Sequence, residues 1–210
     1  MSKFSPYTGH IHRRHPHSLR YLAPAITGSP KQIQERRALP NPFRSGKCHR
    51  EERTGGYQGM LAIRPATERD FSAILEVQRQ AFGEYRDVYE VSAWTTETID
   101  SLKADAQEKH VLVAEADGGV VGSVRFWTVA GVCVIRLLSV APAHQGRGTA
   151  KALLAEIERA TMDAHKFYAC TMLRTPRNIH LFLRLGYHPE TLLPDHYHHL
   201  DLICFAKYRP

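Results

Sequence analysis

The sequence predicts an α+β fold in which a mostly antiparallel central sheet is flanked by helices. Segments with apolar residues at helical spacing alternate with apolar runs of strand length. Three of these runs follow one another with only short turns between them, which predicts an antiparallel meander. A later succession of strand, helix and strand requires a crossover, so we expect at least one parallel pair of strands.

The first elements lie between residues 61 and 108. The stretch LAIR is a short predicted strand that Pro65 ends, and Thr67 with Asp70 forms the expected helix cap. Apolar residues then recur at helical spacing from Phe71 to Phe82. After a polar loop, a second helix is predicted from about Thr96 to Glu108.

The meander is predicted over residues 110–140. Its strands are HVLVAEA, VVGSVRFWTV and VCVIRLLSV, and Asp117–Gly119 predicts a tight hairpin between the first two. An amphipathic helix, a strand (FYACTML), a helix (RNIHLFLRL) that Gly186 ends and a last strand (HHLDLICFAKY) follow. The apolar stripe of the amphipathic helix comprises Ala150, Leu153, Leu154, Ile157 and Ala164.

The first 59 residues differ from the rest in charge and in pattern. They hold eleven Lys and Arg against three Asp and Glu, whereas residues 60–210 are close to neutral. Because they show no sustained period, they cannot bury enough apolar surface to offset the entropy of ordering, and we predict that residues 1–59 are disordered. Three interpretations stay open: a basic arm that binds nucleic acid, a transit peptide, and an extension that is not translated in the cell.

The remaining composition is that of an ordinary soluble protein. Hydrophobic residues make up 43% of the 210 residues, and no apolar run approaches the roughly 18 residues of a membrane span. None of the four cysteines has C-x-x-C spacing, and Cys133, Cys170 and Cys204 lie in apolar runs, which indicates reduced thiols and a cytoplasmic location. We expect residues 60–210 to form one domain, as a monomer or homodimer, with no membrane or nucleic-acid partner.

A glycine-rich turn joins the third strand of the meander to the helix after it. Residues 143–152 read AHQGRGTAKA. The N–H groups of such a turn converge on one point and the helix dipole adds positive charge there, so the turn suits a phosphate. Lys151 lacks the neighbours of a Walker loop, and the third glycine of a dinucleotide fingerprint is absent. Glycines that serve only a tight turn are the alternative interpretation.

The strand, the V-A-P after it and the motif Gln145-x-x-Gly148-x-Ala150 resemble the acyl-CoA pyrophosphate loop of the GNAT N-acetyltransferase superfamily. Downstream, RNIHLFLRLGY is similar to the second signature of that family, N-x-x-x-Y-x-x-x-G-[FY]. The likeness extends from Leu61 to about Lys207. It implies a GNAT-like sheet and an acyltransferase that moves an acyl group from acetyl-CoA to an amine of a small molecule or peptide by direct attack.

The resemblance also implies a set of cofactor-binding residues. Backbone groups of Leu138, Ser139 and Val140 would bind the pantetheine arm. The pyrophosphate would lie against the cradle formed by Gln145, Gly146, Arg147, Gly148, Thr149 and Ala150. A solvated side chain is the alternative for Arg147. Asn178 matches a family residue that binds the cofactor or caps the helix, and a plain N-cap stays open for it.

The sequence assigns no catalytic residue. The resemblance implies that Phe182 contacts the cofactor. Phe182 stands where many family members carry a tyrosine that protonates the departing thiolate. A thiol of pKa about 8.5 leaves with little help, so removing the proton of an amine of pKa about 10.4 is the harder problem. The candidates for proton transfer are Glu84, Tyr85, Tyr168 and Tyr187.

The polarity of the acceptor stays open. The loop that holds Glu84, Tyr85, Asp87, Tyr89 and Glu90 would attract a cationic amine, if it is more than a solvated loop. Against this, Arg174 and Arg177 would hold an acidic group of either the cofactor or the substrate.

Two other classes of protein are also considered. A His-rich tract of the kind that binds Zn or Cu comprises His196, His198 and His199, with His188 nearby. No Cys or carboxylate stands at a recognisable second-ligand spacing, so we predict no metal. The second class is an acyl-CoA-binding module without turnover, whose basic arm binds nucleic acid.

A start at Met60 is the first testable prediction. Met60 directly precedes the first predicted strand, and Thr54-Gly55-Gly56 can be encoded by codons containing AGGAGG, which pairs with bacterial ribosomal RNA. For a bacterial source we expect the intact mass of the protein from its native cells to correspond to a chain that starts at Met60 or Leu61. A chain that starts at Ser2 would contradict this and favour the basic arm, whose nucleic-acid binding would depend steeply on salt.

Overall fold

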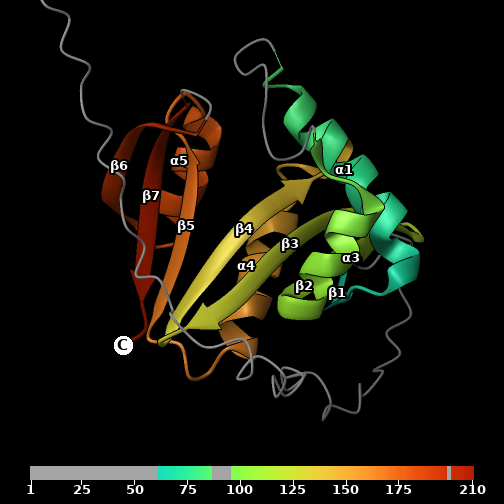
Figure 1. The fold of residues 1–210 in the computed structure, drawn as a ribbon, viewed down its shortest axis with the longest axis horizontal. Coiled ribbons are helices and arrows are strands. Elements are labelled where there is room, and N and C mark those ends of the chain that lie inside the picture. The colour runs from blue at the N-terminus through green and yellow to red at the C-terminus, as the bar shows by residue number, and fades with distance from the viewer. Residues whose placement is uncertain (1–60, 87–95, 198–199) are drawn as a thin grey trace, which may run out of the picture. The chain divides into compact units, whose positions relative to one another are not determined.

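The computed structural model describes residues 61–86, 96–197 and 200–210. The predicted disorder of residues 1–59 therefore lies outside the described residues, as do Asp87, Tyr89, Glu90, His198 and His199. The described residues form one seven-stranded sheet in the order β1-β2-β3-β4-β5-β7-β6 (Figure 1). All neighbouring strands are antiparallel except β4 and β5, which confirms the predicted α+β class and the parallel pair.

The strands and helices follow in nearly the predicted order. The strands are β1 (Ala62–Pro65), β2 (His110–Ala116), β3 (Gly119–Val129), β4 (Val132–Val140), β5 (Lys166–Met172), β6 (His188–Tyr197) and β7 (Leu200–Tyr208). The helices are α1 (Phe71–Gly83), α3 (Ile99–Glu108), α4 (Thr149–Ala160) and α5 (Pro176–Arg184). A short 3-10 helix, Glu68–Asp70, precedes α1, and another, Pro142–His144, precedes the glycine-rich turn.

Helices cover both faces of the sheet, with α1 and α3 on the face opposite α4 (Figure 1). Successive side chains of a strand point to opposite faces, and β2 shows the consequence. Its Leu112 and Ala114 belong to the core that α4 covers, whereas Val111 and Val113 pack in the core that α1 and α3 cover. The main α4 contributions to the first core are Leu153, Leu154 and Ile157.

The predicted hairpin between β2 and β3 is present. Asp117 has a φ of 54° and Gly118 a φ of 78°, and a two-residue turn with both central φ values positive matches the twist of the flanking strands. Two helix details differ from the prediction. The helix α3 begins at Ile99, where Thr98 accepts a hydrogen bond from the Ser101 N–H. Ala164 is buried but lies beyond the end of α4.

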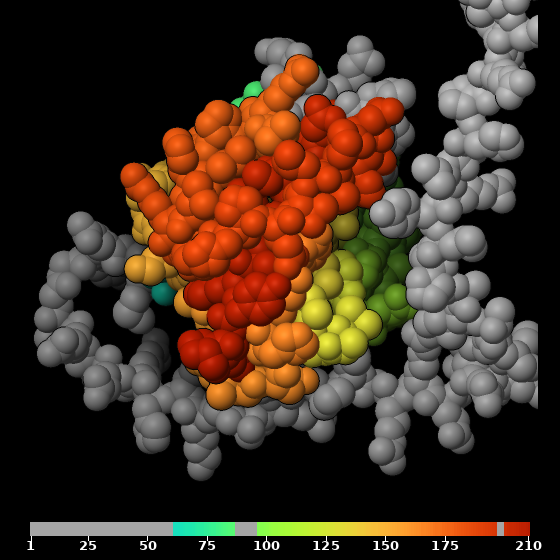
Figure 2. Space-filling view, turned by 90° about the vertical axis from the view of Figure 1, so that its left-hand side faces the viewer, coloured from blue at the N-terminus to red at the C-terminus, as the bar shows by residue number. Residues whose placement is uncertain are grey.

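The strand β6 was missed in the sequence, and the predicted order of elements was wrong at this point. Pro189 and Pro194 interrupt the strand pattern, because proline cannot donate to a sheet. The structure accommodates both because β6 is an edge strand whose pairing with β7 shifts register between Pro189 and Thr191 and again between Leu193 and Tyr197. The C-terminal segments, orange to red, form most of the face seen in Figure 2.

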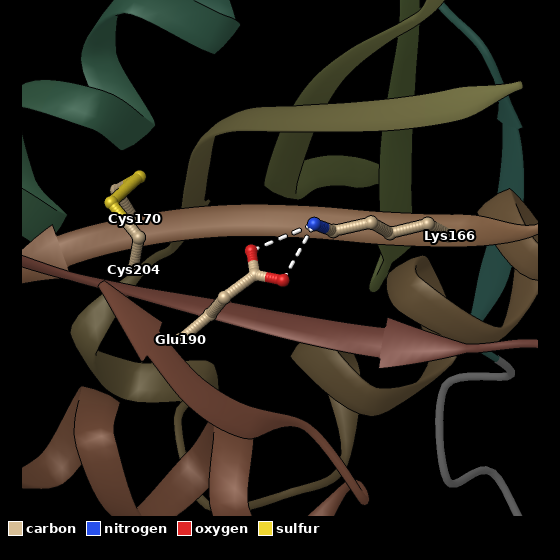
Figure 3. The surroundings of a disulfide bond; sticks show 4 residues. All are labelled: Lys166, Cys170, Glu190 and Cys204. Carbon is tan, nitrogen blue, oxygen red and sulfur yellow. Dashed lines mark hydrogen bonds and ion pairs between the residues drawn. A yellow bond between two sulfur atoms is a disulfide. The ribbon is translucent and has the colours of Figure 1, made fainter. Parts of the chain in front are cut away.

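Cys170 and Cys204 form a disulfide between β5 and β7, which corrects the expectation of reduced thiols (Figure 3). The two residues are direct partners across the antiparallel pair, so their side chains leave the sheet on the same face. Glu190 of β6 binds the ammonium of Lys166, which lies on β5, the strand that carries Cys170 (Figure 3). Cys133 is buried and reduced, as the sequence predicted for an apolar strand.

The described helices include none that is both long and apolar enough to cross a membrane.

The start of α1 depends on one buried carboxylate. Asp70 accepts hydrogen bonds from the Arg64 guanidinium at 2.8 and 2.9 Å and from the Thr67 N–H at 2.7 Å. Asp70 is only 7% exposed. The hydrogen bonds from Arg64, more than any other cause, hold the pKa of Asp70 well below its usual value, and burial opposes them. The pair links β1 to the start of α1.

We predict that Asp70→Asn lowers the free energy of unfolding at pH 7 by about 1–3 kcal/mol, because the amide cannot satisfy the same donors. The pKa of Asp70 is lower in the folded state than in the unfolded state, so its contribution is complete above the unfolded pKa of about 3.9 and is lost as the pH falls below it. Urea unfolding at pH 7 and pH 3 should therefore show a difference between wild type and variant that shrinks in acid. The exposed Asp163→Asn serves as the control, and an equal loss in both variants would contradict the assignment.

Candidate active site

The parallel strands β4 and β5 pair over only part of their length. Val132–Ile135 pairs with Lys166–Ala169, and beyond these residues the two strands diverge (Figure 1). The remainder of β4 pairs only with β3, and the remainder of β5 only with β7. Backbone N–H and C=O groups that face the gap therefore have no strand partner within the described sheet.

A bulge in β4 accompanies this divergence. Ser123 pairs with Ser139 and Arg125 with Arg136, so two residues of β4, Leu137 and Leu138, lie opposite a single residue of β3. Leu137 has a φ of 52°, in the left-handed region that costs energy for any residue except glycine. Because a bulge bends its strand, it separates the end of β4 from β5.

A cavity of about 1010 Å³ lies against this gap. It is lined by the diverging ends of β4 and β5, the glycine-rich turn, the end of α1 and one side of α5. All but one of the predicted cofactor-binding residues line it together: Leu138, Ser139, Val140, Gln145, Gly146, Gly148, Thr149, Ala150, Asn178 and Phe182. Arg147 does not line the cavity.

The glycine-rich turn presents unpaired backbone donors. Gly146 and Gly148 have φ values of 74° and 88°, and a Cβ added to either would meet no protein atom within 4 Å. The Gln145 side chain donates to the Val140 carbonyl at 2.9 Å and ties the turn to the end of β4. Among the described residues, no acceptor binds the backbone N–H groups from Gly146 to Lys151. With the N-terminal dipole of α4, this open turn fits a phosphate.

The residues of α5 close one side of the cavity. Thr175 is the N-cap of α5, so the interpretation of Asn178 as a plain N-cap was wrong. Asn178 instead donates from its side chain to the Thr171 hydroxyl at 3.1 Å, which links α5 to the end of β5. Phe182 is 5% exposed and stacks on Phe205, with ring centroids 5.3 Å apart.

The four candidates for proton transfer lie in two different places. Glu84 and Tyr85, at the end of α1, both line the cavity. Burial raises the pKa of Tyr85, so its phenol is protonated at neutral pH. Tyr168 lies under the Lys166 ammonium and Tyr187 is buried beneath α5, and neither lines the cavity. Burial raises the pKa of both of these phenols as well.

The Glu84 carboxylate accepts a hydrogen bond from the Arg177 guanidinium. This ion pair connects the end of α1 to the first turn of α5. Arg174, the other arginine singled out in the sequence, does not line the cavity.

Sequence reasoning missed several basic residues of the cavity. His180 and Arg184 follow Arg177 at intervals that place all three on one face of α5, a signal that helical spacing could have provided. Arg136, His144 and Lys151 also line the cavity, and their position depends on the bulge and on the turn.

The prediction that no metal binds concerns the His-rich tract, and the structure describes only part of this tract. His196 lines the cavity, and His198 and His199 lie outside the described residues. Within the described ranges, no three His, Cys, Asp or Glu side chains come together as metal ligands.

The chain is similar to acetyltransferases in sequence and in structure. Residues 107–189 match the family model of the acetyltransferase (GNAT) domain. The PaiA N-acetyltransferase from Thermoplasma acidophilum, solved with coenzyme A, is 16% identical with a TM-score of 0.62, and the alignment covers 71% of this chain and 99% of that one. No curated protein sequence matches the chain.

Two further solved structures have the same fold. The ribosomal-protein-alanine N-acetyltransferase from Brucella melitensis is 25% identical, with a TM-score of 0.59 and coverage of 70% of this chain and 99% of that one. A spermidine N-acetyltransferase SpeG chimera from Vibrio cholerae and hSSAT is 18% identical, with a TM-score of 0.58 and coverage of 70% and 95%. Residues 107–189 therefore match an acetyltransferase (GNAT) domain, and the described residues share the fold of solved N-acetyltransferases, one of them with coenzyme A bound.

Proposed function

We propose that this chain is an acetyl-CoA-dependent N-acetyltransferase that acetylates an amine of a small molecule or peptide by direct attack. The observation that carries the proposal is the continuous cavity that runs from the open glycine-rich turn, between β4 and β5, to Glu84 and Tyr85. A donor with phosphates at one end and a reactive group at the other fits such a cavity.

The glycine-rich turn supports binding of the donor at its phosphate end. The unpaired N–H groups from Gly146 to Lys151 favour binding of an anion. Lys151 also lines the cavity and adds a positive charge there. Backbone groups of Leu138, Ser139 and Val140 that face the gap would pair with the amides of the pantetheine arm. Asn178 and Phe182 would contact the donor from α5.

Acetyl-CoA supplies an acetyl thioester whose acyl carbon the amine attacks, and its thiol, with a pKa near 8.5, leaves readily as a thiolate. The harder task for the protein is to deprotonate the amine. Glu84 lies where a carboxylate would attract the ammonium form of the acceptor and pass its proton to water. Tyr85, protonated because burial raises its pKa, would donate a hydrogen bond at the same end of the cavity.

The proposal predicts that acetyl-CoA stabilises the protein through the glycine-rich turn. At a concentration of 100 times Kd the stabilisation is about 2.7 kcal/mol, which raises the Tm by roughly 5–10 °C. Gly148→Glu should abolish this shift, because the new side chain brings a carboxylate into the phosphate cradle. Thermal unfolding with and without acetyl-CoA, together with thiol release on a panel of amines, measures both steps.

Gly118→Glu is the matched control. Gly118 and Gly148 both have a positive φ and open space around an added Cβ, so the two variants carry a similar backbone cost. Gly118 lies in the hairpin between β2 and β3, outside the cavity lining, and its variant should keep the full Tm shift. An unchanged shift in Gly148→Glu would contradict the cofactor site, and binding without thiol release from any amine would favour a non-catalytic module.

A further inference from the structure

We propose that the acceptor amine carries a carboxylate within a few bonds of the reacting nitrogen, as an α-amino acid does. This inference rests on the proposed function and names the class of acceptor. It is carried by the basic side chains that line the same cavity as Glu84.

The ion pair between Glu84 and Arg177 is the first observation. Both residues line the cavity, and their side chains are 38% and 57% exposed, so water screens the pair and a ligand can replace it at little cost. An acceptor with an ammonium and a carboxylate satisfies both partners at once, because the ammonium binds Glu84 and the carboxylate binds Arg177. A simple amine would leave Arg177 without its carboxylate.

The second observation is Arg136, which lies on the face of the sheet that α1 and α3 cover. Arg136 lies directly opposite Arg125 in the β3–β4 pair, and the Arg125 guanidinium binds Asp105 of α3, which places both arginines on the face that α1 and α3 cover. Arg125 is neutralised by Glu97 and Asp105. Arg136 is exposed, and no described side chain forms a hydrogen bond or ion pair with its guanidinium.

Arg125 already has two carboxylate partners, whereas the Arg136 guanidinium has none among the described residues, so an anion beside Arg136 is favourable. Arg136 also precedes the bulge at Leu137 and lines the cavity. It is therefore placed to bind an anionic group of the acceptor, at the end of the cavity where β4 leaves β5.

The total charge of the cavity lining supports the same class of acceptor. Its charged residues among those described are Glu84, Arg136, Lys151, Arg177 and Arg184. Lys151 is in the first turn of α4 and serves the phosphates of the donor. The remaining arginines exceed the single carboxylate, which favours an acceptor with an acidic group and opposes a polyamine.

The experiment compares amino acids with their own amides in a thiol-release assay. The amide lacks the carboxylate, and its α-amine, with a pKa of about 8, is more often neutral than that of the free amino acid. If only the fraction of neutral amine mattered, the amide should react faster than the free amino acid. We expect kcat/KM to be at least tenfold higher for the free amino acid for the best side chain of a panel that also includes spermidine and an alanine peptide.

Variants identify the residues responsible. Arg136→Gln and Arg177→Gln should each raise the KM for the amino acid at least tenfold, leave the KM for acetyl-CoA unchanged and lower kcat/KM for the amide by a much smaller factor. Arg136→Lys should restore part of the loss. The control is Arg69→Gln, which removes an exposed arginine outside the cavity lining and should change neither KM.

The outcomes separate this inference from the proposed function. Amides, spermidine or the alanine peptide reacting as well as the free amino acids would overturn the acceptor class while the acetyltransferase stands. Equal loss of amide and amino-acid turnover in the arginine variants would also overturn it. An acetyl-CoA-dependent Tm shift without turnover of any amine would overturn both.

Discussion

The missing strand pairing between β4 and β5 is the constraint on which the rest of the site depends. Backbone N–H and C=O groups away from water need hydrogen-bond partners, and beyond Ile135 and Ala169 the sheet does not provide them. A ligand with amide groups can. The glycine-rich turn continues from the end of β4 and Asn178 is tied to the end of β5, so each wall of the gap positions one part of the candidate site.

Local patterns in the sequence predicted most of the fold. The hairpin at Asp117 needs only two residues with positive φ, and the apolar stripe of α4 is visible over three turns. What could not be predicted depends on neighbours distant in sequence. The prolines of β6 are tolerated only because β6 is an edge strand, and the Cys170–Cys204 disulfide exists only because β5 and β7 are adjacent.

The candidate site divides in the same way. The proposed phosphate cradle is one continuous segment that its glycines make recognisable in the sequence, and all of its predicted residues except Arg147 line the cavity. The part of the cavity proposed for the acceptor is lined by residues of α1, β4 and α5. The bulge at Leu137, the exposure of Arg136 and the Glu84–Arg177 ion pair follow from how these elements pack, and no short motif encodes them. Tyr168 and Tyr187 were considered for their chemistry alone, and packing places both away from the cavity.

Residue-resolved amide hydrogen exchange with and without coenzyme A tests the central claim most directly. If the gap between β4 and β5 holds the donor, coenzyme A should slow exchange at those amides of residues 136–140 that face β5 and at the amides from Gly146 to Lys151. The amides of β4 that already pair with β3 should change little and provide the internal reference. Binding of coenzyme A with protection confined to other segments would contradict the account.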